Sequence, residues 1–570
     1  MKGRNQRSSP DFVAGLLLLA LGLFPVETKA DNHDFLWLRT AGGSGAEVSR
    51  QMVVDDAGSS YIIGAFDFTN LHFGNIILTN TQPASVHTWD GFIVKYDTSG
   101  NVVWAKKFGG TNDDRGSGIA VDAQHNCYVT GWFDSSNFYI DGVTLTNSSP
   151  AGNSSLFVAK FDPSANLQWA RGLNGTYNHN DMKITVDSVG NYYLTGNFSG
   201  TNTFGNTNLV SRGPSNVLLL KYDPAGNLLW AQSAGGTDRD GGAGIGLDAT
   251  NNVYILANIR STNAAFGSFV FSVYGADTCQ NLVVAKYDPA GNVIWARQCG
   301  GTRIDAGTGI AVDKTGYCYI TGNTGSTNLF FGSITLTNNY NPLPLTAIFV
   351  ARLGHSGNVL WANAAQGDNS VASSGIAVNQ FGDCYIAGYF QSSNLVFRPD
   401  YFGTTILTNS ESGFSTWADA FVAKFDVYGQ LLRAVQPRGV NDQRAYSIAL
   451  DPAANIYITG WTQGTNVLFG SFAATNAYLD MFVAKIDPDF PLLQIESGES
   501  SVFNIPGMMV ISWPINQTGS AGANLEFSTN LVTWCPPDVY VMSLVSADRY
   551  YHLVFEKTGE RNFFRLRLSE

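Results

Sequence analysis

Charged residues are scarce in this sequence, at 14% of 570 residues, and basic residues are the scarcer kind. The 33 Lys and Arg against 45 Asp and Glu give a formal net charge of −12. A nucleic-acid-binding surface needs concentrated positive charge, so we expect no nucleic-acid partner. Because 44% of the residues are hydrophobic, the low charge does not indicate disorder, and the composition is that of a folded chain.

Catalytic motifs are also lacking. The seven histidines show neither His-x-His nor His-Glu-x-x-His spacing, so they do not suggest a catalytic metal. The sequence contains no Gly-x-Ser-x-Gly elbow and no Gly-x-x-x-x-Gly-Lys phosphate loop. We therefore predict a protein without enzymatic activity or cofactor. A paired acid and base among the many carboxylates stays open.

Long hydrophobic runs are absent except at the start. A thirteen-residue apolar run, 12–24, follows the basic residues Lys2, Arg4 and Arg7, and the small-residue site Thr28-Lys29-Ala30 comes after it. This pattern predicts a signal peptide over residues 1–30 and hence a secreted or cell-surface protein, with the periplasm as a further possibility. No other apolar stretch approaches twenty residues, so we expect no transmembrane segment.

Cysteines are few, at six, and an exported chain permits disulfides without requiring them. Three of them occupy one repeat position in different units, which separates them too far for bonding. The pair with suitable positions is Cys279 and Cys299, which flank one predicted hairpin. Whether they form a disulfide stays open, and structural packing is the alternative.

What the chain does contain is a repeat that occurs seven times. Each unit has an outer aromatic position, an acidic position, a glycine position and a basic position. The aromatic positions are Trp37, Trp104, Trp169, Trp230, Trp295 and Trp361, with Arg433 in the seventh unit. The acidic positions are Asp55, Asp122, Asp187, Asp248, Asp313, Asn379 and Asp451. The basic positions are Lys95, Lys160, Lys221, Lys286, Arg352, Lys424 and Lys485.

Spacing within the repeat is constant except in one segment. The aromatic position precedes the acidic one by 18 residues, and the acidic one precedes the glycine position by 9, in all seven units. Only the distance from the glycine to the basic position varies, from 25 to 36 residues. Four short Val/Ile/Tyr/Phe-rich segments per unit, bounded by Gly, Asn and Asp, predict four antiparallel strands. The fold class is therefore all-β, a seven-bladed β-propeller.

The two ends of the repeat predict how the ring closes. The chain opens with an aromatic strand, Phe35–Thr40, and its seventh unit ends without one. We expect the N-terminal strand to complete the last blade, which would remove an exposed sheet edge.

The segments Gly109–Asp122 with Tyr128–Gly131, and Gly301–Asp313 with Tyr319–Gly322, resemble the bacterial β-propeller repeat called SBBP. The resemblance covers about residues 35–490. It implies an exported or surface-associated propeller and no particular reaction.

Residues 491–570 do not continue the repeat. Segments 508–513, 524–528, 550–555 and 563–567 have the composition of short strands among Pro and Gly turns, and a small β-sandwich-like module is expected. The predicted domains are thus a signal peptide at 1–30, a propeller at 31–490 and a C-terminal module at 491–570.

Candidate binding residues lie in and beside the variable segment. The position eight residues before the acidic one carries Glu47, Asp114, Asp240 and Asp305, which would place carboxylates around a channel mouth where Ca²⁺ could bind. The alternative is a recurring turn cap. Four tryptophans belong to the variable segments and would contact a sugar ring or a protein partner unless they pack against a hairpin: Trp89, Trp132, Trp417 and Trp461.

Loops that vary in length on one face of a rigid scaffold are where binding sites usually occur. We therefore predict an exported binding or scaffolding module whose partner is a protein or a polysaccharide of the cell surface or its surroundings. The alternatives are a carbohydrate-active hydrolase or lyase on the same ring, or a purely structural cell-envelope protein.

Overall fold

A computed structural model describes residues 35–43, 45–67, 69–82, 87–149, 153–177, 182–275, 279–338, 346–400, 403–410, 417–439, 441–487, 539–547, 550–557 and 560–567. All regular elements in these residues are β-strands, so the all-β prediction is confirmed. No helix in these residues is long and apolar enough to cross a membrane. The chain divides into two compact units, residues 1–488 and 489–570.

The first unit contains seven blades of four antiparallel strands. In chain order, and from the inner strand outward, they are β2 (Glu47–Val54), β3 (Ser60–Phe66), β6 (Asp90–Tyr96), β7 (Val102–Gly109); β8 (Asp114–Val121), β9 (Cys127–Phe133), β12 (Ser154–Phe161), β13 (Leu167–Tyr177); β14 (Lys183–Val186), β15 (Tyr192–Phe198), β18 (Asn216–Tyr222), β19 (Leu228–Ala234); β20 (Gly241–Leu247), β21 (Val253–Ile259), β24 (Asn281–Tyr287), β25 (Val293–Cys299); β26 (Asp305–Val312), β27 (Cys318–Thr324), β30 (Ala347–Leu353), β31 (Val359–Gly367); β32 (Val371–Val378), β33 (Cys384–Phe390), β36 (Asp419–Phe425), β37 (Leu431–Val435); and β38 (Gln443–Leu450), β39 (Ile456–Phe469), β40 (Phe472–Ile486), β1 (Phe35–Gly43).

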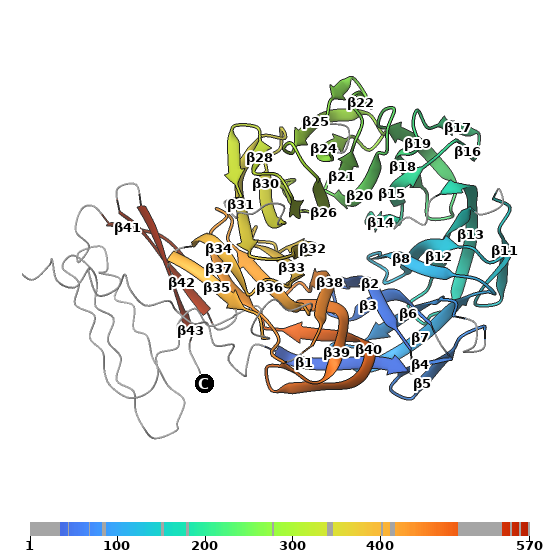
Figure 1. The fold of residues 1–570 in the computed structure, drawn as a ribbon, viewed down its shortest axis with the longest axis horizontal. Helices are drawn as coiled ribbons and strands as arrows, with labels where there is room; N and C mark the ends of the chain where they lie inside the picture. Colours follow the sequence, from blue (N-terminus) through green and yellow to red (C-terminus); the bar gives the residue numbers. More distant parts are fainter. Residues whose placement is uncertain are drawn as a thin grey trace, which may run out of the picture. The chain divides into compact units, whose positions relative to one another are not determined.

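These blades surround a common centre, with β1 beside the strands of blade 7 (Figure 1). β1 pairs antiparallel with β40 from Phe35 opposite Ile486 to Ala41 opposite Met481. The expectation that the N-terminal strand completes the last blade is therefore confirmed. We call the contact of β1 with β40, together with the start of β2, the closing seam.

The core lies between neighbouring blades, because each sheet buries both of its faces. The second and third strands of each blade are almost wholly buried, as in β3 and β6, where every residue is buried. The outer-strand tryptophans reach across to the next blade: Trp295 Nε1 donates to His355 O at 2.8 Å, and Trp361 Nε1 donates to Val427 O at 3.0 Å. These contacts join the outer strands of blades 4 and 5 to a turn of the following blade.

The variable segments contain short hairpins that attach to the preceding blade. They are β4–β5 (Asn70–Phe73, Ile76–Thr79), β10–β11 (Asn137–Ile140, Val143–Thr146), β16–β17 (Thr201–Phe204, Thr207–Val210), β22–β23 (Ala264–Phe266, Phe269–Phe271), β28–β29 (Asn328–Phe331, Ile334–Thr337) and β34–β35 (Asn394–Asp400, Gly403–Thr408); in blade 7 the hairpin is the far end of β39 and β40. In six blades the hairpin pairs with the outer strand of the preceding blade, for example Ile140 with Phe108.

The second unit is described only at its end, as a three-stranded meander of β41 (Val539–Ala547), β42 (Tyr550–Lys557) and β43 (Glu560–Arg567). β42 and β43 contain the strands expected at 550–555 and 563–567, whereas β41 was not expected. The segments 508–513 and 524–528 lie outside the described residues, as does the predicted signal peptide.

Candidate functional site

One face of the propeller carries the turns between first and second strands and between third and fourth strands, and on it every blade repeats the same polar cluster. In blade 1, Asp55 Oδ1 accepts hydrogen bonds from Ala57 N at 3.1 Å and Ser59 N at 2.8 Å, and its Oδ2 accepts one from Tyr61 OH at 3.1 Å. Lys95 Nζ lies 4.7 Å from the centre of the Tyr61 ring. The acidic position is therefore a turn former, bridged to a Tyr and a Lys.

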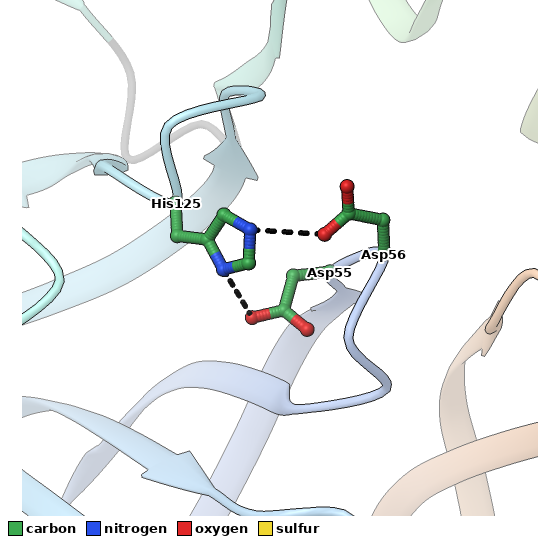
Figure 2. Close-up of side chains that lie close together, drawn as sticks. All are labelled: Asp55, Asp56 and His125. Atoms are coloured by element: carbon green, nitrogen blue, oxygen red, sulfur yellow. Dashed lines mark ion pairs between the residues drawn. The ribbon is translucent and has the colours of Figure 1, made fainter.

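On the same face, His125 bridges a turn of blade 2 to a turn of blade 1 (Figure 2). Its Nδ1 lies 3.2 Å from Asp55 Oδ2 and its Nε2 lies 2.9 Å from Asp56 Oδ1. Among the described residues these three side chains are the one group of His, Cys, Asp and Glu with metal-ligand atoms this close together. The two carboxylates lie against different ring nitrogens of His125. These imidazole–carboxylate contacts connect blade 2 to blade 1.

The opposite face carries the variable segments, and here the inner strands begin. Asp114, the first residue of β8, is fully buried, and its Oδ2 accepts a hydrogen bond from Ser135 Oγ at 2.6 Å. Asp240 and Ser261 form the same contact at 2.7 Å, and Asp305 and Ser326 form it at 2.9 Å. Backbone N–H groups complete each cluster, as from Gly236 to Asp240 at 2.6 Å. We call this contact the Asp–Ser pair; it joins residues twenty-one apart in three blades.

Burial raises the pKa of Asp114 to about 7 even though the hydrogen bonds from Ser135 lower it. The same balance raises the pKa values of Asp240 and Asp305. Their oxygens accept hydrogen bonds from their own blade and its loops, which is what the turn-cap alternative predicts. A Ca²⁺ ring at these positions stays a prediction.

Other blades lack one member of the pair. In blade 6 Val371 replaces the acid, and Ser392 Oγ is buried without a hydrogen-bond partner. In blade 7 Gln443 stands in its place and its Nε2 donates to Asn441 O at 2.7 Å. In blade 1 the acid is Glu47, which is fully buried, and neither of its carboxylate oxygens has a hydrogen-bond partner among the described residues. The predicted position is thus shared by four blades and performs the same role in only three.

Arginine–aromatic stacks distinguish two junctions on this face. At the junction of blades 1 and 2, the Arg115 guanidinium lies 4.3 Å from the ring centre of Trp89 and 5.6 Å from that of Trp132. Asp113 Oδ2 is 3.5 Å from Arg115 Nη2. Arg115 is opposite Trp132 across β8 and β9, near the end where β8 begins. Two of the predicted tryptophans therefore share one guanidinium, which contacts both rings.

The junction of blades 6 and 7 repeats the arrangement with different residues. The Arg444 guanidinium lies 4.7 Å from the ring centre of Tyr389 and 5.3 Å from that of Trp461. Asp442 accepts from Arg444 Nε at 3.1 Å and from Nη2 at 3.0 Å. Trp461 Nε1 also donates to Tyr446 OH at 2.8 Å. The Asp442 carboxylate is the main cause that raises the pKa of Arg444, against an opposing effect of burial.

The fourth predicted tryptophan, Trp417, is half-buried just before β36, and its carbonyl accepts from Asn409 Nδ2 at 3.4 Å. In blade 6 the residue that matches Trp89 is Ala418. The carbonyl of Trp89 accepts a hydrogen bond from Asp114 N at the start of β8, and the carbonyl of Ala418 accepts one from Gln443 N at the start of β38. Conversely, Ala65 of blade 1 matches Tyr389. The junction of blades 1 and 2 therefore pairs the large Trp89 with the small Ala65. The junction of blades 6 and 7 pairs the small Ala418 with the large Tyr389.

The two junctions among blades 3, 4 and 5 carry neither arginine nor aromatic side chains at the matching places. The residue after the glycine position is Asn197, Asn258 or Asn323 in blades 3 to 5. Asn258 and Gly307 exchange hydrogen bonds across the junction of blades 4 and 5, at 2.8 and 3.1 Å. The variable-segment face thus has an aromatic, arginine-bearing half and an amide-lined half.

Our sequence analysis did not single out Arg115, Arg444 or Tyr389. Aligning the seven units by their fixed spacing would have found them, because Arg follows the first inner-strand residue in blades 2 and 7 and aromatic residues follow the glycine position in blades 2, 6 and 7. The candidate disulfide is not formed: Cys279 and Cys299 are both buried free thiols. Cys279 Sγ instead lies 2.9 Å from Thr302 O.

Comparison with known proteins gives the same picture of the repeat. The family model described as SBBP, a beta-propeller repeat, matches residues 294–330 and 439–466. An uncharacterized WD repeat-containing protein from Acanthamoeba polyphaga mimivirus is 27% identical over 65% of this chain and 31% of that protein. The regulatory protein FlaEY of Caulobacter vibrioides is 28% identical over 33% of this chain and 20% of that protein. The chain therefore spans less than a third of either relative.

Among solved structures, Sqt1 from Chaetomium thermophilum is similar to 79% of this chain over its whole length, at 8% identity and a TM-score of 0.36. The Pan2 WD40 domain of Neurospora crassa matches 65% of this chain at 9% identity and a TM-score of 0.30. The matched repeats, the seven four-stranded sheets and the ring closed by the first strand together show a seven-bladed β-propeller in which two segments match the SBBP repeat.

Proposed function

We propose that this chain is an exported, non-catalytic binding or scaffolding module that takes a protein or glycan partner on its variable-segment face. The observation that carries the proposal is the pair of arginine–aromatic stacks on that face. Aromatic and arginine side chains are enriched at the energetic centres of protein interfaces. Export rests on the basic and apolar segments of residues 1–30.

The two stacks are well suited to recognition because their side chains are held in place before a partner arrives. Arg115 and Arg444 are each about a quarter exposed, at 23% of their side chains, so their outer N–H groups reach solvent. Each guanidinium is fixed by two rings and by the carboxylate of Asp113 or Asp442. A preorganised side chain loses little conformational entropy on binding, which favours affinity.

A test must separate binding from turnover. We would present the mature protein to a glycan array and to surface-protein extracts, and measure reducing-sugar release from each glycan that binds. Retention of a ligand without release of reducing ends supports the proposal, and turnover of a bound glycan would replace it with the hydrolase or lyase alternative.

The site itself is tested with Trp89→Ala and Trp461→Ala, which each remove one ring from a stack. We expect each variant to weaken binding at least tenfold. Phe381→Ala removes an aromatic side chain that is 58% exposed on a turn of the opposite face, and should leave binding unchanged. Equal losses in all three variants would place the ligand elsewhere.

A further inference from the structure

The closing seam brings together the first and last strands of the ring, and Glu47 lies where they meet. β1 ends at Gly43, and the inner strand of blade 1 begins four residues later with Glu47. Across the seam, Ser49 Oγ donates to Gly460 O at 3.2 Å and Ser447 Oγ accepts from Met52 N at 3.1 Å. These hydrogen bonds hold blade 1 against blade 7. The chain itself connects the two blades here only between Gly43 and Glu47.

Glu47 is unlike the residues that match it. The matching carboxylates of Asp114, Asp240 and Asp305 each accept a hydrogen bond from a serine hydroxyl twenty-one residues later. In blade 1 that place in the sequence is Phe68, which has no hydroxyl and lies outside the described residues. A buried carboxylate without donors is costly when ionised, by several kcal/mol in typical proteins.

The charged groups that face Glu47 make its ionisation still less favourable, because both are carboxylates. Asp480 comes from β40, and Asp67 comes from the segment after β3. Asp480 is packed against β1, where a Cβ on Gly42 would lie 2.2 Å from Asp480 Cγ. Asp67 Oδ1 accepts from Ala46 N at 2.7 Å. The backbone N–H of Gly43 favours the ionised form only weakly, since neither Glu47 oxygen accepts a hydrogen bond of normal geometry.

We propose that the closing seam is a proton-dependent latch, in which a neutral Glu47 holds the N-terminal strand against blade 7 and an ionised Glu47 loosens it. Proton loss would place a third negative charge beside Asp480 and Asp67 in a buried site. The least costly response is to admit water by separating β1 from β40, because β1 is the one strand of blade 7 that is not continuous with the rest of that blade.

The raised pKa of Glu47 sets the direction in which the stability of the closing seam changes with pH. Burial, with the Asp480 and Asp67 carboxylates, raises the pKa of Glu47 from 4.5 to about 9. Burial also raises the pKa of Asp480 to about 6. A carboxyl group with a raised pKa in the folded state stabilises that state fully below the unfolded value of about 4.5, and this contribution is lost as pH rises toward about 9. The seam is therefore tightest in acid and opens in alkali.

Glu47→Gln tests the latch, because the amide has nearly the same shape and cannot ionise. We expect its melting temperature to exceed that of the wild type by an amount that grows from pH 5 to pH 9, to on the order of 3 °C. Glu47→Asp keeps a carboxylate and should keep the pH dependence. Asp480→Asn, which removes one repelling charge, should reduce it and serves if Glu47→Gln does not fold.

A local measurement distinguishes the latch from general alkaline destabilisation. Backbone amide hydrogen exchange of β1, each rate divided by that of the outer strand β7 in the same sample, should rise at least tenfold between pH 6 and pH 9.5 in the wild type and stay constant in Glu47→Gln. A constant ratio in the wild type would overturn the proposal. A second result would also overturn it: millimolar Ca²⁺ at pH 8 raises the melting temperature of the wild type but not that of Glu47→Gln. A cation rather than a proton would then neutralise Glu47.

Discussion

The two faces of this ring differ in how strictly they repeat. On the turn face, the same Asp, Tyr and Lys cluster occurs with little change in every blade, and a tyrosine stands six residues after the acidic position in all seven units. On the variable-segment face, the Asp–Ser pair is complete in blades 2, 4 and 5 and altered in blades 1, 6 and 7. One face maintains the ring, whereas the other accommodates differences between blades without loss of the fold.

The largest expected loss of stability comes from a substitution on the turn face. Trp295 is 4% exposed, and its Nε1 donates to His355 O of the next blade at 2.8 Å. Trp295→Ala should lower the free energy of unfolding by about 3–5 kcal/mol, measured by chemical denaturation. Trp461→Ala, on the other face, removes a ring that is only partly buried and should cost clearly less. Equal costs would remove the distinction between the faces.

A smaller effect compares two serines in matching places. Ser326 Oγ donates to Asp305 at 2.9 Å and accepts from Arg303 N at 3.0 Å, whereas Ser392 Oγ has no partner in the described part of the chain. Ser326→Ala leaves a buried carboxylate short of a donor, so we expect a loss of about 1–3 kcal/mol. Ser392→Ala should change stability by less than about 0.5 kcal/mol. If both denaturation midpoints shift alike, the Asp–Ser pair contributes nothing specific.

The smallest effect concerns the stacks. Arg115→Lys replaces a planar guanidinium that contacts two rings with a compact ammonium, and should cost about 0.5–1 kcal/mol. Arg444→Lys should cost more, because it also loses the two hydrogen bonds to Asp442. Thermal melts of the two variants at one salt concentration give the order. The reverse order would mean that the rings, and not the carboxylate, hold Arg444 in place.

The architecture could be predicted from the sequence because spacing alone determined it. The constant intervals between the aromatic, acidic and glycine positions gave seven units, and the unpaired aromatic strand at the start gave the closure of β1 on β40. The place of the variable hairpins on the preceding blade was not predicted, since the contact of Ile140 with Phe108 joins segments whose pairing leaves no periodic signal.

The candidate site was only partly predictable. Trp89, Trp132 and Trp461 do take part in the stacks, but their partners Arg115 and Arg444 stand at positions that hold small residues in several other blades. Glu47 was grouped with Asp114, Asp240 and Asp305 because a sequence shows the acid and not its hydrogen bonds. The sequence does show that Phe68 stands where the matching blades have a serine, but not that the Glu47 oxygens are buried without a donor among the described residues.

The antiparallel pairing of Phe35 with Ile486 also has a mechanical consequence. Phe35, at the start of β1, lies opposite Ile486, at the end of β40, so a force that pulls these two residues apart acts on one pair of residues at a time. Such loading ruptures the hydrogen bonds in succession, from Trp37 opposite Lys485 toward Ala41 opposite Met481, at far lower tension than sliding the strands past each other. Under tension, the ring would therefore open first at the closing seam, by separation of β1 from β40.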